Sequence, residues 1–111
     1  MKIFSNIQFD FDFRLPNDQK LLDEFKKPIF ENRFFISKNS LIKNSKIVKL
    51  NKNIWDKNPF KFSLDMYDNS LFAHVILLVN DLSSYSDFNS DTIIDVIVPN
   101  KQTISKIIEN I

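Results

Sequence analysis

Two carboxylates, Asp10 and Asp12, are the first residues along the chain whose spacing could do chemistry. They lie in the stretch IQFDFDFRL, residues 7–15, where apolar and polar residues alternate. Residues two apart on a strand share a face about 6.5 to 7 Å apart, a spacing that a cation or a carboxylate pair can use. A hard cation needs further oxygen ligands, and no other acid stands beside them. We therefore expect a solvated strand face whose charge complements either Lys46 or Lys49 of the same chain or a basic partner.

The single histidine, His74, lies in the most apolar stretch of the chain, between Phe72 and Ile76. A nucleophilic triad would use it as the base, but the chain has no cysteine and no serine in a nucleophile-elbow pattern. We expect a buried, hydrogen-bonded core histidine. The catalytic alternative is a general acid or base that acts with Asp10 or Asp12. The sequence thus predicts no catalytic residue and no enzymatic activity.

Residues 87–91 read DFNSD, which spaces oxygen ligands as the start of an EF-hand calcium loop does. The pattern then fails, because the sixth position requires glycine and is Thr92, and the twelfth requires glutamate and is Val98. The chain also contains no glycine, which excludes the glycine-rich loops that bind phosphates and dinucleotides. We predict neither a metal nor a cofactor.

The elements that must position these residues are predicted from periodicity, turn residues and prolines. Apolar residues alternate over 5–15 and 60–66, and the run at 70–80 is apolar on both faces, as in a central strand. The C-terminal stretch instead spaces its isoleucines as on one face of a helix. The sequence predicts strands at 5–15, 28–37, 45–50, 60–66, 70–80 and 92–99, helices at about 17–27 and 100–111, and a loop at 81–91.

This order of elements predicts an α+β fold, with a mainly antiparallel sheet of about five to six strands and the two helices packed against one face. A length of 111 residues, of which 43% are hydrophobic, fits a single globular domain over residues 1–111. The apolar runs are too short for a membrane-spanning helix or a signal peptide. We expect no membrane association and a cytoplasmic location.

The net charge of +1 hides a strong asymmetry along the chain. Residues 26–61 hold ten basic residues against two acidic ones, whereas residues 62–100 contain no Lys or Arg. The centre of the acidic stretch is the predicted loop at 81–91, which also carries two aromatic residues. Aromatic residues in such a loop have no periodic reason to be buried, although either one alone could fold back onto the core. Acids around exposed aromatics are typical of a protein interface.

These observations favour a small non-enzymatic protein-binding inhibitor. The expected partner is a protein with a basic surface, such as a toxin domain. The expected contacts are Asp81, Tyr85, Asp87, Phe88 and Asp91, with Asp10 and Asp12 as secondary candidates. An immunity protein or antitoxin that occludes the groove of a nuclease-like toxin fits this surface best. The abundance of Ile, Phe, Asn and Lys, typical of AT-rich bacterial or phage genes, points the same way.

The basic middle of the chain supports an alternative, a nucleic-acid-binding module that uses the Lys-rich segment 38–61. Its candidate residues are Lys43, Lys46, Lys49, Lys52 and Trp55. Only two arginines, Arg14 and Arg33, are available for bidentate contacts to phosphate or bases, and AT-rich codons inflate the lysine count. Nucleic acid is therefore the less expected partner.

Overall fold

The computed structural model describes residues 18–111. The predicted strand at 5–15, with Asp10 and Asp12, lies outside the described residues. The α-helices are α1 (Asp18–Phe25), α2 (Arg33–Ile36), α3 (Lys38–Lys43), α4 (Lys52–Trp55), α5 (Pro59–Tyr67), α6 (Ala73–Val79) and α7 (Lys101–Glu109). The strands are β1 (Ser45–Lys49) and β2 (Asp95–Pro99), and short 3₁₀ turns form η2 (Ile29–Glu31), η3 (Ser70–Phe72) and η4 (Tyr85–Asp87).

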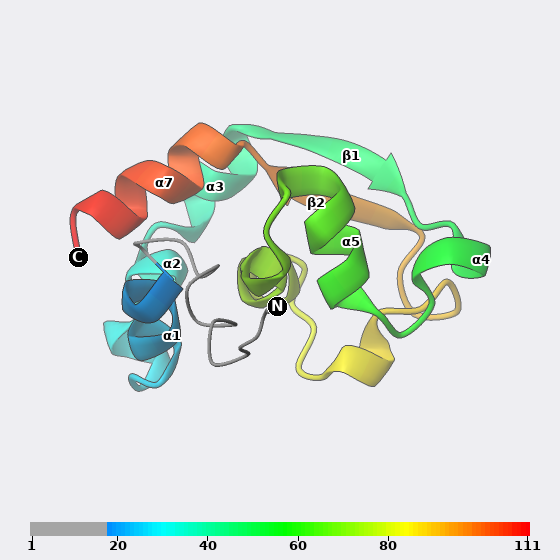
Figure 1. Cartoon of the computed structure of the whole chain (residues 1–111), viewed down its shortest axis with the longest axis horizontal. Helices are drawn as coiled ribbons and strands as arrows, with labels where there is room; N and C mark the ends of the chain where they lie inside the picture. Colours follow the sequence, from blue (N-terminus) through cyan, green and yellow to red (C-terminus); the bar gives the residue numbers. More distant parts are fainter. Residues whose placement is uncertain (1–17) are drawn as a thin grey trace, which may run out of the picture.

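The described residues form a mostly helical fold with one two-stranded antiparallel sheet (Figure 1). The prediction of a sheet of about five to six strands with two helices on one face is therefore wrong. The predicted helices near both ends correspond to α1 and α7, and two of the predicted strands correspond to β1 and β2. The segments 28–37, 60–66 and 70–80 are helical instead. Over residues 18–111, no helix has both the length and the apolar character needed to cross a membrane.

In the segment 28–37, Asn32 caps the start of α2. The side-chain oxygen of Asn32 accepts hydrogen bonds from the backbone N–H groups of Phe34 at 2.8 Å and Phe35 at 3.1 Å. This contact satisfies N–H groups that the first turn of a helix leaves without partners. Local capping here outweighs the strand preference of aromatic residues.

Helix α5 begins where Asn58 caps it and Pro59 occupies its first turn. The side-chain oxygen of Asn58 accepts a hydrogen bond from the N–H of Lys61 at 3.1 Å. The helix ends at Asp68, which adopts a left-handed conformation with φ of 62°. The buried residues follow helical spacing and are Pro59, Phe62, Ser63 and Tyr67. The alternation over 60–66 is therefore not the pattern of burial, and Leu64 is exposed.

The apolar run at 70–80 forms η3 and α6, and α6 lies at the centre of Figure 1, seen nearly end-on. Val75, Ile76 and Val79 are buried, and α6 contacts α2, α3, α5 and β2. A helix surrounded by other elements needs apolar residues on every side, as a central strand does. The run correctly indicates a central element, but the element is a helix.

β1 and β2 pair antiparallel, with Ile47 directly opposite Ile97. Just beyond the ladder, Asn100 donates its N–H to the carbonyl of Asn44 at 2.7 Å. Hydrogen-bonded and non-hydrogen-bonded residue pairs alternate along an antiparallel ladder. The contact between Asn100 and Asn44 therefore shows that the even-numbered residues of the two strands form the hydrogen-bonded pairs. The odd-numbered residues of both strands, including Ile47 and Ile97, therefore direct their backbone groups away from the partner strand.

Two side chains occupy the outer edge of β2. The Oδ1 atom of Asn80 accepts a hydrogen bond from the N–H of Ile97 at 2.8 Å, and its Nδ2 atom donates to the carbonyl of Ile97 at 3.0 Å. The hydroxyl of Tyr67 donates to the carbonyl of Pro99 at 2.6 Å. Burial raises the pKa of Tyr67, which keeps this hydroxyl protonated as a donor. Pro99 has no N–H to satisfy, so the edge is closed at both residues.

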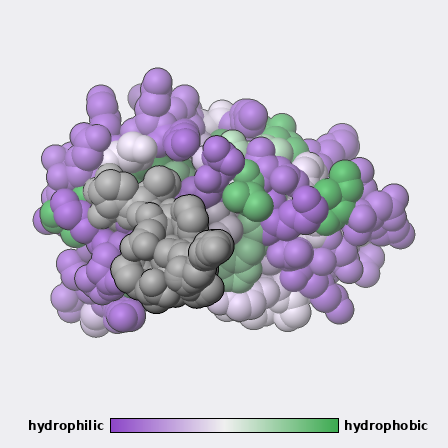
Figure 2. Space-filling model, viewed as in Figure 1, coloured by the Kyte–Doolittle hydropathy of each residue, from purple (hydrophilic) through white to green (hydrophobic). Residues whose placement is uncertain are grey.

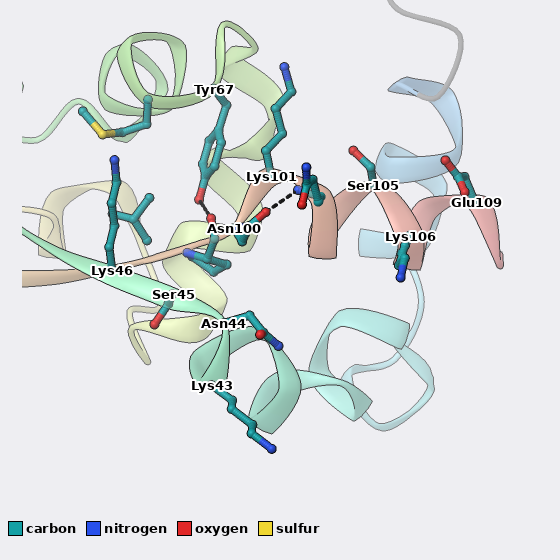
Figure 3. Close-up of a pocket in the computed structure, with 14 residues that line it drawn as sticks. Lys43, Asn44, Ser45, Lys46, Tyr67, Asn100, Lys101, Ser105, Lys106 and Glu109 are labelled. Carbon is teal, nitrogen blue, oxygen red and sulfur yellow. Dashed lines mark hydrogen bonds between the residues drawn. The ribbon is translucent and has the colours of Figure 1, made fainter.

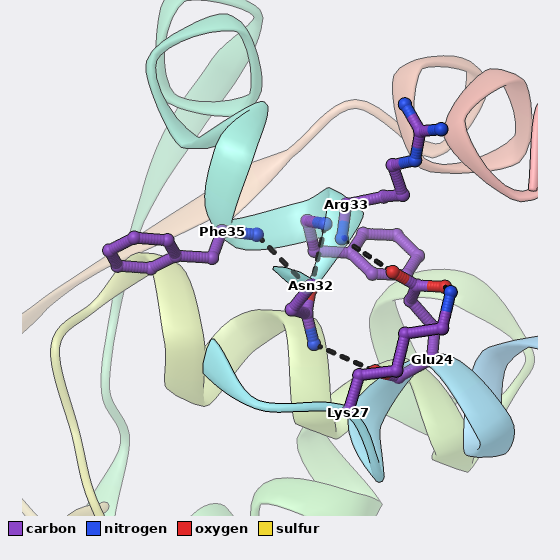
Figure 4. A network of polar contacts seen from close by, with 6 residues as sticks. Glu24, Lys27, Asn32, Arg33 and Phe35 are labelled. Atoms are coloured by element: carbon purple, nitrogen blue, oxygen red, sulfur yellow. Dashed lines mark hydrogen bonds and ion pairs between the residues drawn. The ribbon is translucent and has the colours of Figure 1, made fainter. Parts of the chain in front are cut away.

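The charged residue Glu24 is fully buried and links α1 to α2 (Figure 4). Its Oε2 atom accepts a hydrogen bond from the N–H of Arg33 at 2.6 Å, and its carbonyl accepts one from Nδ2 of Asn32 at 3.2 Å. The Lys27 ammonium lies 3.0 Å from Oε1, which accepts no hydrogen bond from the described residues. A buried charge is stable only when it is compensated, and the ion pair with Lys27 compensates the charge at Oε1.

Candidate functional site

The acidic loop, residues 81–91, begins at a left-handed turn. Asp81 has φ of 57°, and its N–H donates to the carbonyl of Leu78 at 3.2 Å. The N–H of Leu82 donates to the carbonyl of Leu77 at 2.9 Å. Glycine usually occupies this position after a helix, and in a chain without glycine an aspartate serves because it tolerates the left-handed region better than most residues. The turn fixes where the acidic loop leaves the core.

The carboxylate of Asp81 forms an ion pair with the ammonium group of Lys38 on α3. The Asp81 side chain is nevertheless 78% exposed. Ion pairs at the surface stabilise a fold only slightly, because water competes for both charges. The pair therefore orients Asp81 while leaving its charge accessible to another molecule.

Tyr85 opens η4 and is 49% exposed. Its ring lies edge-on to Phe60, with 4.9 Å between the ring centroids. The expectation of an exposed aromatic residue in the acidic loop is therefore confirmed for Tyr85. Packing against Phe60 limits the motion of the ring, so less conformational entropy is lost when a partner covers it.

The expectation that Phe88 is exposed is wrong, because its side chain is 0% exposed. Its ring packs against Phe62 at 5.2 Å, and its carbonyl accepts a hydrogen bond from the N–H of Lys57 at 2.8 Å. Phe88 is thus the aromatic residue that folds back onto the core. It anchors the acidic loop and offers no surface to a partner.

The DFNSD pattern builds a turn. The Oδ1 atom of Asn89 accepts hydrogen bonds from the N–H groups of Asp91 at 2.9 Å and Thr92 at 3.0 Å. The carboxylate of Asp87 accepts one from the Ser83 hydroxyl at 3.1 Å. Within residues 18–111, no group of three or more His, Cys, Asp or Glu side chains is placed to hold a metal ion. Asp87 is half-buried, whereas Asp91 is exposed.

A hollow of about 690 Å³ lies beside the acidic loop, and we call it the apolar hollow. It is lined by residues of α1, η2, α2, α3, α6 and the loop itself. Its apolar lining includes Phe25, Ile29, Phe35, Leu77 and Leu82, and Lys38, Asp81 and Tyr85 also line it. The structure therefore joins two of the predicted contact residues, Asp81 and Tyr85, to an apolar surface that sequence periodicity did not indicate.

His74 also lines the apolar hollow. Its ring lies 5.4 Å from the ring of Phe25 and 5.9 Å from that of Phe60, and burial lowers its pKa. The expectation of a buried, hydrogen-bonded core histidine is wrong, since His74 is half-buried and forms no side-chain hydrogen bond with the described residues. The catalytic alternative depends on Asp10 or Asp12, which lie outside the described residues.

Exposed apolar residues continue from the apolar hollow onto η2 and α2. Ile29 lines the hollow and is exposed, and Ile36 is exposed on α2. Phe30 is 79% exposed and lies edge-on to Phe35, with 5.7 Å between the ring centroids. On the face drawn in Figure 2, the described residues are mainly hydrophilic with separate hydrophobic areas. Contiguous exposed apolar surface is uncommon in monomeric proteins and marks interaction sites.

A second hollow, of about 940 Å³, is lined by four lysines, and we call it the basic groove. Lys43 and Lys46 belong to the predicted nucleic-acid-binding residues, whereas Lys101 and Lys106 of α7 do not. None of the four forms an ion pair with another described residue. In Figure 3, Lys46 and Lys101 extend toward the top of the view and Lys43 and Lys106 toward the bottom. The positive charge is spread along the groove and is not focused on one point.

The other residues of the predicted nucleic-acid set lie elsewhere. Trp55 packs edge-on against Phe62 at 4.8 Å, and its Nε1 atom donates to the carboxylate of Asp65 at 2.8 Å. This hydrogen bond, aided by Lys61, lowers the pKa of Asp65. Lys49 and Lys52 are exposed but do not line the basic groove. The structure therefore divides the predicted set, and Trp55 is not a free stacking surface for a base.

Comparison of the chain with models of protein families, with curated proteins and with solved structures finds no match.

Proposed function

We propose that the protein is a non-enzymatic binding module that attaches to a basic protein surface through the acidic loop and the apolar hollow. The observation that carries this proposal is Tyr85, which is 49% exposed beside a hollow of about 690 Å³ with apolar walls. A half-exposed tyrosine next to an apolar cavity is the arrangement typical of a binding hot spot.

Charge and apolar surface together favour a protein partner. Asp81 and Asp91 are exposed on the acidic loop, and the exposed Phe30, which packs edge-on against Phe35, extends the apolar surface. Interfaces commonly place aromatic and aliphatic side chains at the centre and charges around them. Carboxylates on such a surface steer it toward a basic partner and can occupy a groove built for phosphate. An immunity protein or antitoxin that covers the active groove of a nuclease-like toxin is the specific form that we propose.

The test uses the product of the gene adjacent to this one, purified as a catalytically inactive variant, and measures affinity by calorimetry at several salt concentrations. Tyr85→Ala should weaken binding by more than about tenfold, as loss of a hot-spot aromatic does. Neutralising Asp81, Asp87 and Asp91 together to Asn should also weaken binding and flatten its dependence on salt.

The matched control neutralises three exposed acids elsewhere, Asp23→Asn, Asp56→Asn and Glu109→Gln. These changes remove the same formal charge but leave the acidic loop intact, so most of the affinity should remain. An equal loss of affinity in both triple variants would mean that net charge alone explains the effect. It would refute the assignment of the acidic loop to the interface. Unchanged affinity in Tyr85→Ala would refute the role of the apolar hollow.

A second candidate function, binding to the phosphate backbone of nucleic acid, rests on the basic groove. Its lysines are accompanied by polar residues of the kind that contact phosphate, including Asn44, Ser45 and Gln102. Fluorescence anisotropy with labelled single-stranded DNA and RNA should show affinity that falls steeply as salt rises. Lys101→Glu with Lys106→Glu should abolish it, whereas Lys20→Glu on α1 with Lys26→Glu in the turn after α1 should weaken it far less. Absence of binding at low salt would reject this candidate.

A further inference from the structure

We propose that the outer edge of β1 is a docking site for an extended, acidic segment of another protein, which adds to the sheet as a third strand. The proposal concerns a surface separate from the acidic loop and does not depend on the function assigned to that loop. Its basis is a difference in backbone hydrogen bonding between the outer edges of the two strands.

The outer edge of β2 is closed by side chains from this chain. Asn80 bonds both backbone groups of Ile97, and Tyr67 bonds the carbonyl of Pro99. These three contacts reproduce what a neighbouring strand would supply at those residues. A partner strand therefore has no free backbone groups to bind at Ile97 and Pro99.

Among the described residues, the outer edge of β1 is open. The phase of the ladder directs the backbone groups of Ser45, Ile47 and Lys49 outward, and no strand among residues 18–111 pairs with them. Figure 1 shows β1 along the upper margin of the molecule, with β2 on its inner side. The side chain of Ile47 is 59% exposed at the middle of this edge. An extended peptide could thus form backbone hydrogen bonds here and cover an apolar side chain, as in other cases of strand addition.

The charge around the edge determines which segment fits. Residues 43–52 contain Lys43, Lys46, Lys49 and Lys52 and no acid, and all four lysines are exposed. A second copy of this chain would bring two such segments together, and edge lysines are known to discourage that pairing. An acidic strand instead gains favourable cross-strand pairs. The occupant is therefore acidic.

The spacing of the lysines also predicts the spacing of the acids. Lys46 and Lys49 are three residues apart, so their side chains leave opposite faces of β1. Acids opposite them on a partner strand must also be three residues apart. Lys49 is free to exchange partners, because its contact with Asp95 is long at 3.8 Å and both side chains are exposed.

The test uses an end-capped peptide of alternating Thr and Val with two Glu residues three positions apart, titrated into the isotope-labelled full chain and followed by NMR. Saturable shifts should centre on β1. Hydrogen exchange should slow at the amides of Ser45, Ile47 and Lys49, with little change at Lys46 and Val48, which already face β2. A peptide with Lys in place of Glu should not bind.

Two variants test the mechanism. Ile47→Pro removes an outward N–H without removing a ladder hydrogen bond, so the fold should persist in circular dichroism while peptide binding is lost. Lys46→Glu with Lys49→Glu should weaken binding of the Glu peptide by about tenfold and create binding of the Lys peptide. The control Lys101→Glu with Lys106→Glu makes the same change in charge on α7, away from the edge of β1, and should retain most of the affinity.

Three outcomes would overturn the proposal. The first is equal weakening by the control pair, which would mean that the peptide responds to general charge. The second is protection that does not alternate along β1, or shifts that centre on α7, on the far side of the basic groove from β1. The third is sedimentation showing a dimer that Ile47→Pro dissociates, which would make a second copy the occupant.

Discussion

Replacing Asn80 by alanine should destabilise the protein far more than the exposure of this residue suggests. Asn80 is only half-buried, but its side chain forms three hydrogen bonds. Its Nδ2 atom donates to the carbonyl of Ile76 at 2.8 Å and to that of Ile97 at 3.0 Å, and its Oδ1 atom accepts from the N–H of Ile97 at 2.8 Å.

The chain provides a matched control in Asn110, which ends α7 as Asn80 ends α6. Its Nδ2 atom donates to the carbonyl of Lys106 at 2.9 Å, the same contact four residues back that Asn80 makes with Ile76. The two asparagines differ in the pair of hydrogen bonds to Ile97. A hydrogen bond contributes about 1 kcal/mol, and leaving a buried backbone group without a partner costs about 1 to 3 kcal/mol. The free energy of unfolding should therefore fall by about 2 to 3 kcal/mol more in Asn80→Ala than in Asn110→Ala.

Urea unfolding followed by circular dichroism measures this difference. With a urea dependence of about 1 to 3 kcal/mol per molar for a small protein, the midpoint of Asn80→Ala should lie about 0.7 to 3 M below that of the control. Asn80→Asp keeps the acceptor for the N–H of Ile97 but brings a negative charge toward the carbonyls of Ile76 and Ile97. This substitution should therefore also destabilise the protein strongly. A difference between the two alanine variants below about 0.5 kcal/mol would refute the reading of Asn80 as a substitute for a strand.

Substitutions at Phe88, Glu24 and His74 test the core and its charges. Phe88→Ala should cost about 3 to 5 kcal/mol in urea unfolding, whereas Tyr85→Ala should cost less than about 1 kcal/mol, and equal costs would contradict the assignment of Phe88 to the core. Glu24→Ala leaves the N–H of Arg33 without its acceptor and should cost about 2 kcal/mol, with Glu24→Gln less damaging because it retains that acceptor. Because burial lowers the pKa of His74, the unfolded chain takes up a proton first as pH falls below 6.5, so stability should decline from there toward the lower pKa of the folded state. His74→Gln should reduce the stability difference between about pH 7.5 and 5.5, and an unchanged difference would exclude His74 as its source.

The sequence was sufficient for elements whose local signals agree. The isoleucines of α7 repeat at helical spacing, and Asn100 caps the helix with a bond to the N–H of Gln102 at 2.8 Å. Strand β2 was recognisable from its β-branched residues and from the proline at its end. Alternation over 60–66 was misleading, because Phe60 and Leu64 are apolar without being buried, and Asn58 and Pro59 start a helix there. For the run at 70–80, an apolar segment of that length fits a buried helix as well as a buried strand.

The candidate site, like the fold, was only partly predictable from the sequence. The exposed Tyr85 was predicted from its place in a polar loop, but the same argument failed for Phe88, since a loop without periodicity does not report burial. The apolar hollow depends on how α1, α2 and α6 meet, which is a tertiary property. Lys101 and Lys106 could have been added to the basic set, because antiparallel pairing of the two predicted strands at 45–50 and 92–99 brings the start of the C-terminal helix beside Lys43.

The pairing of β1 with β2 also sets an order of events during folding. The two strands are separated by residues 50–94, so the ladder cannot close until that length of chain is compact. Helices α5 and α6 are neighbours in sequence and contact each other, so they can form first and place Asn80 at the end of α6. Asn80 then offers Ile97 a ready hydrogen-bonding edge, and β2 can dock on the helical core before β1 arrives. On this route β1 joins the sheet after β2.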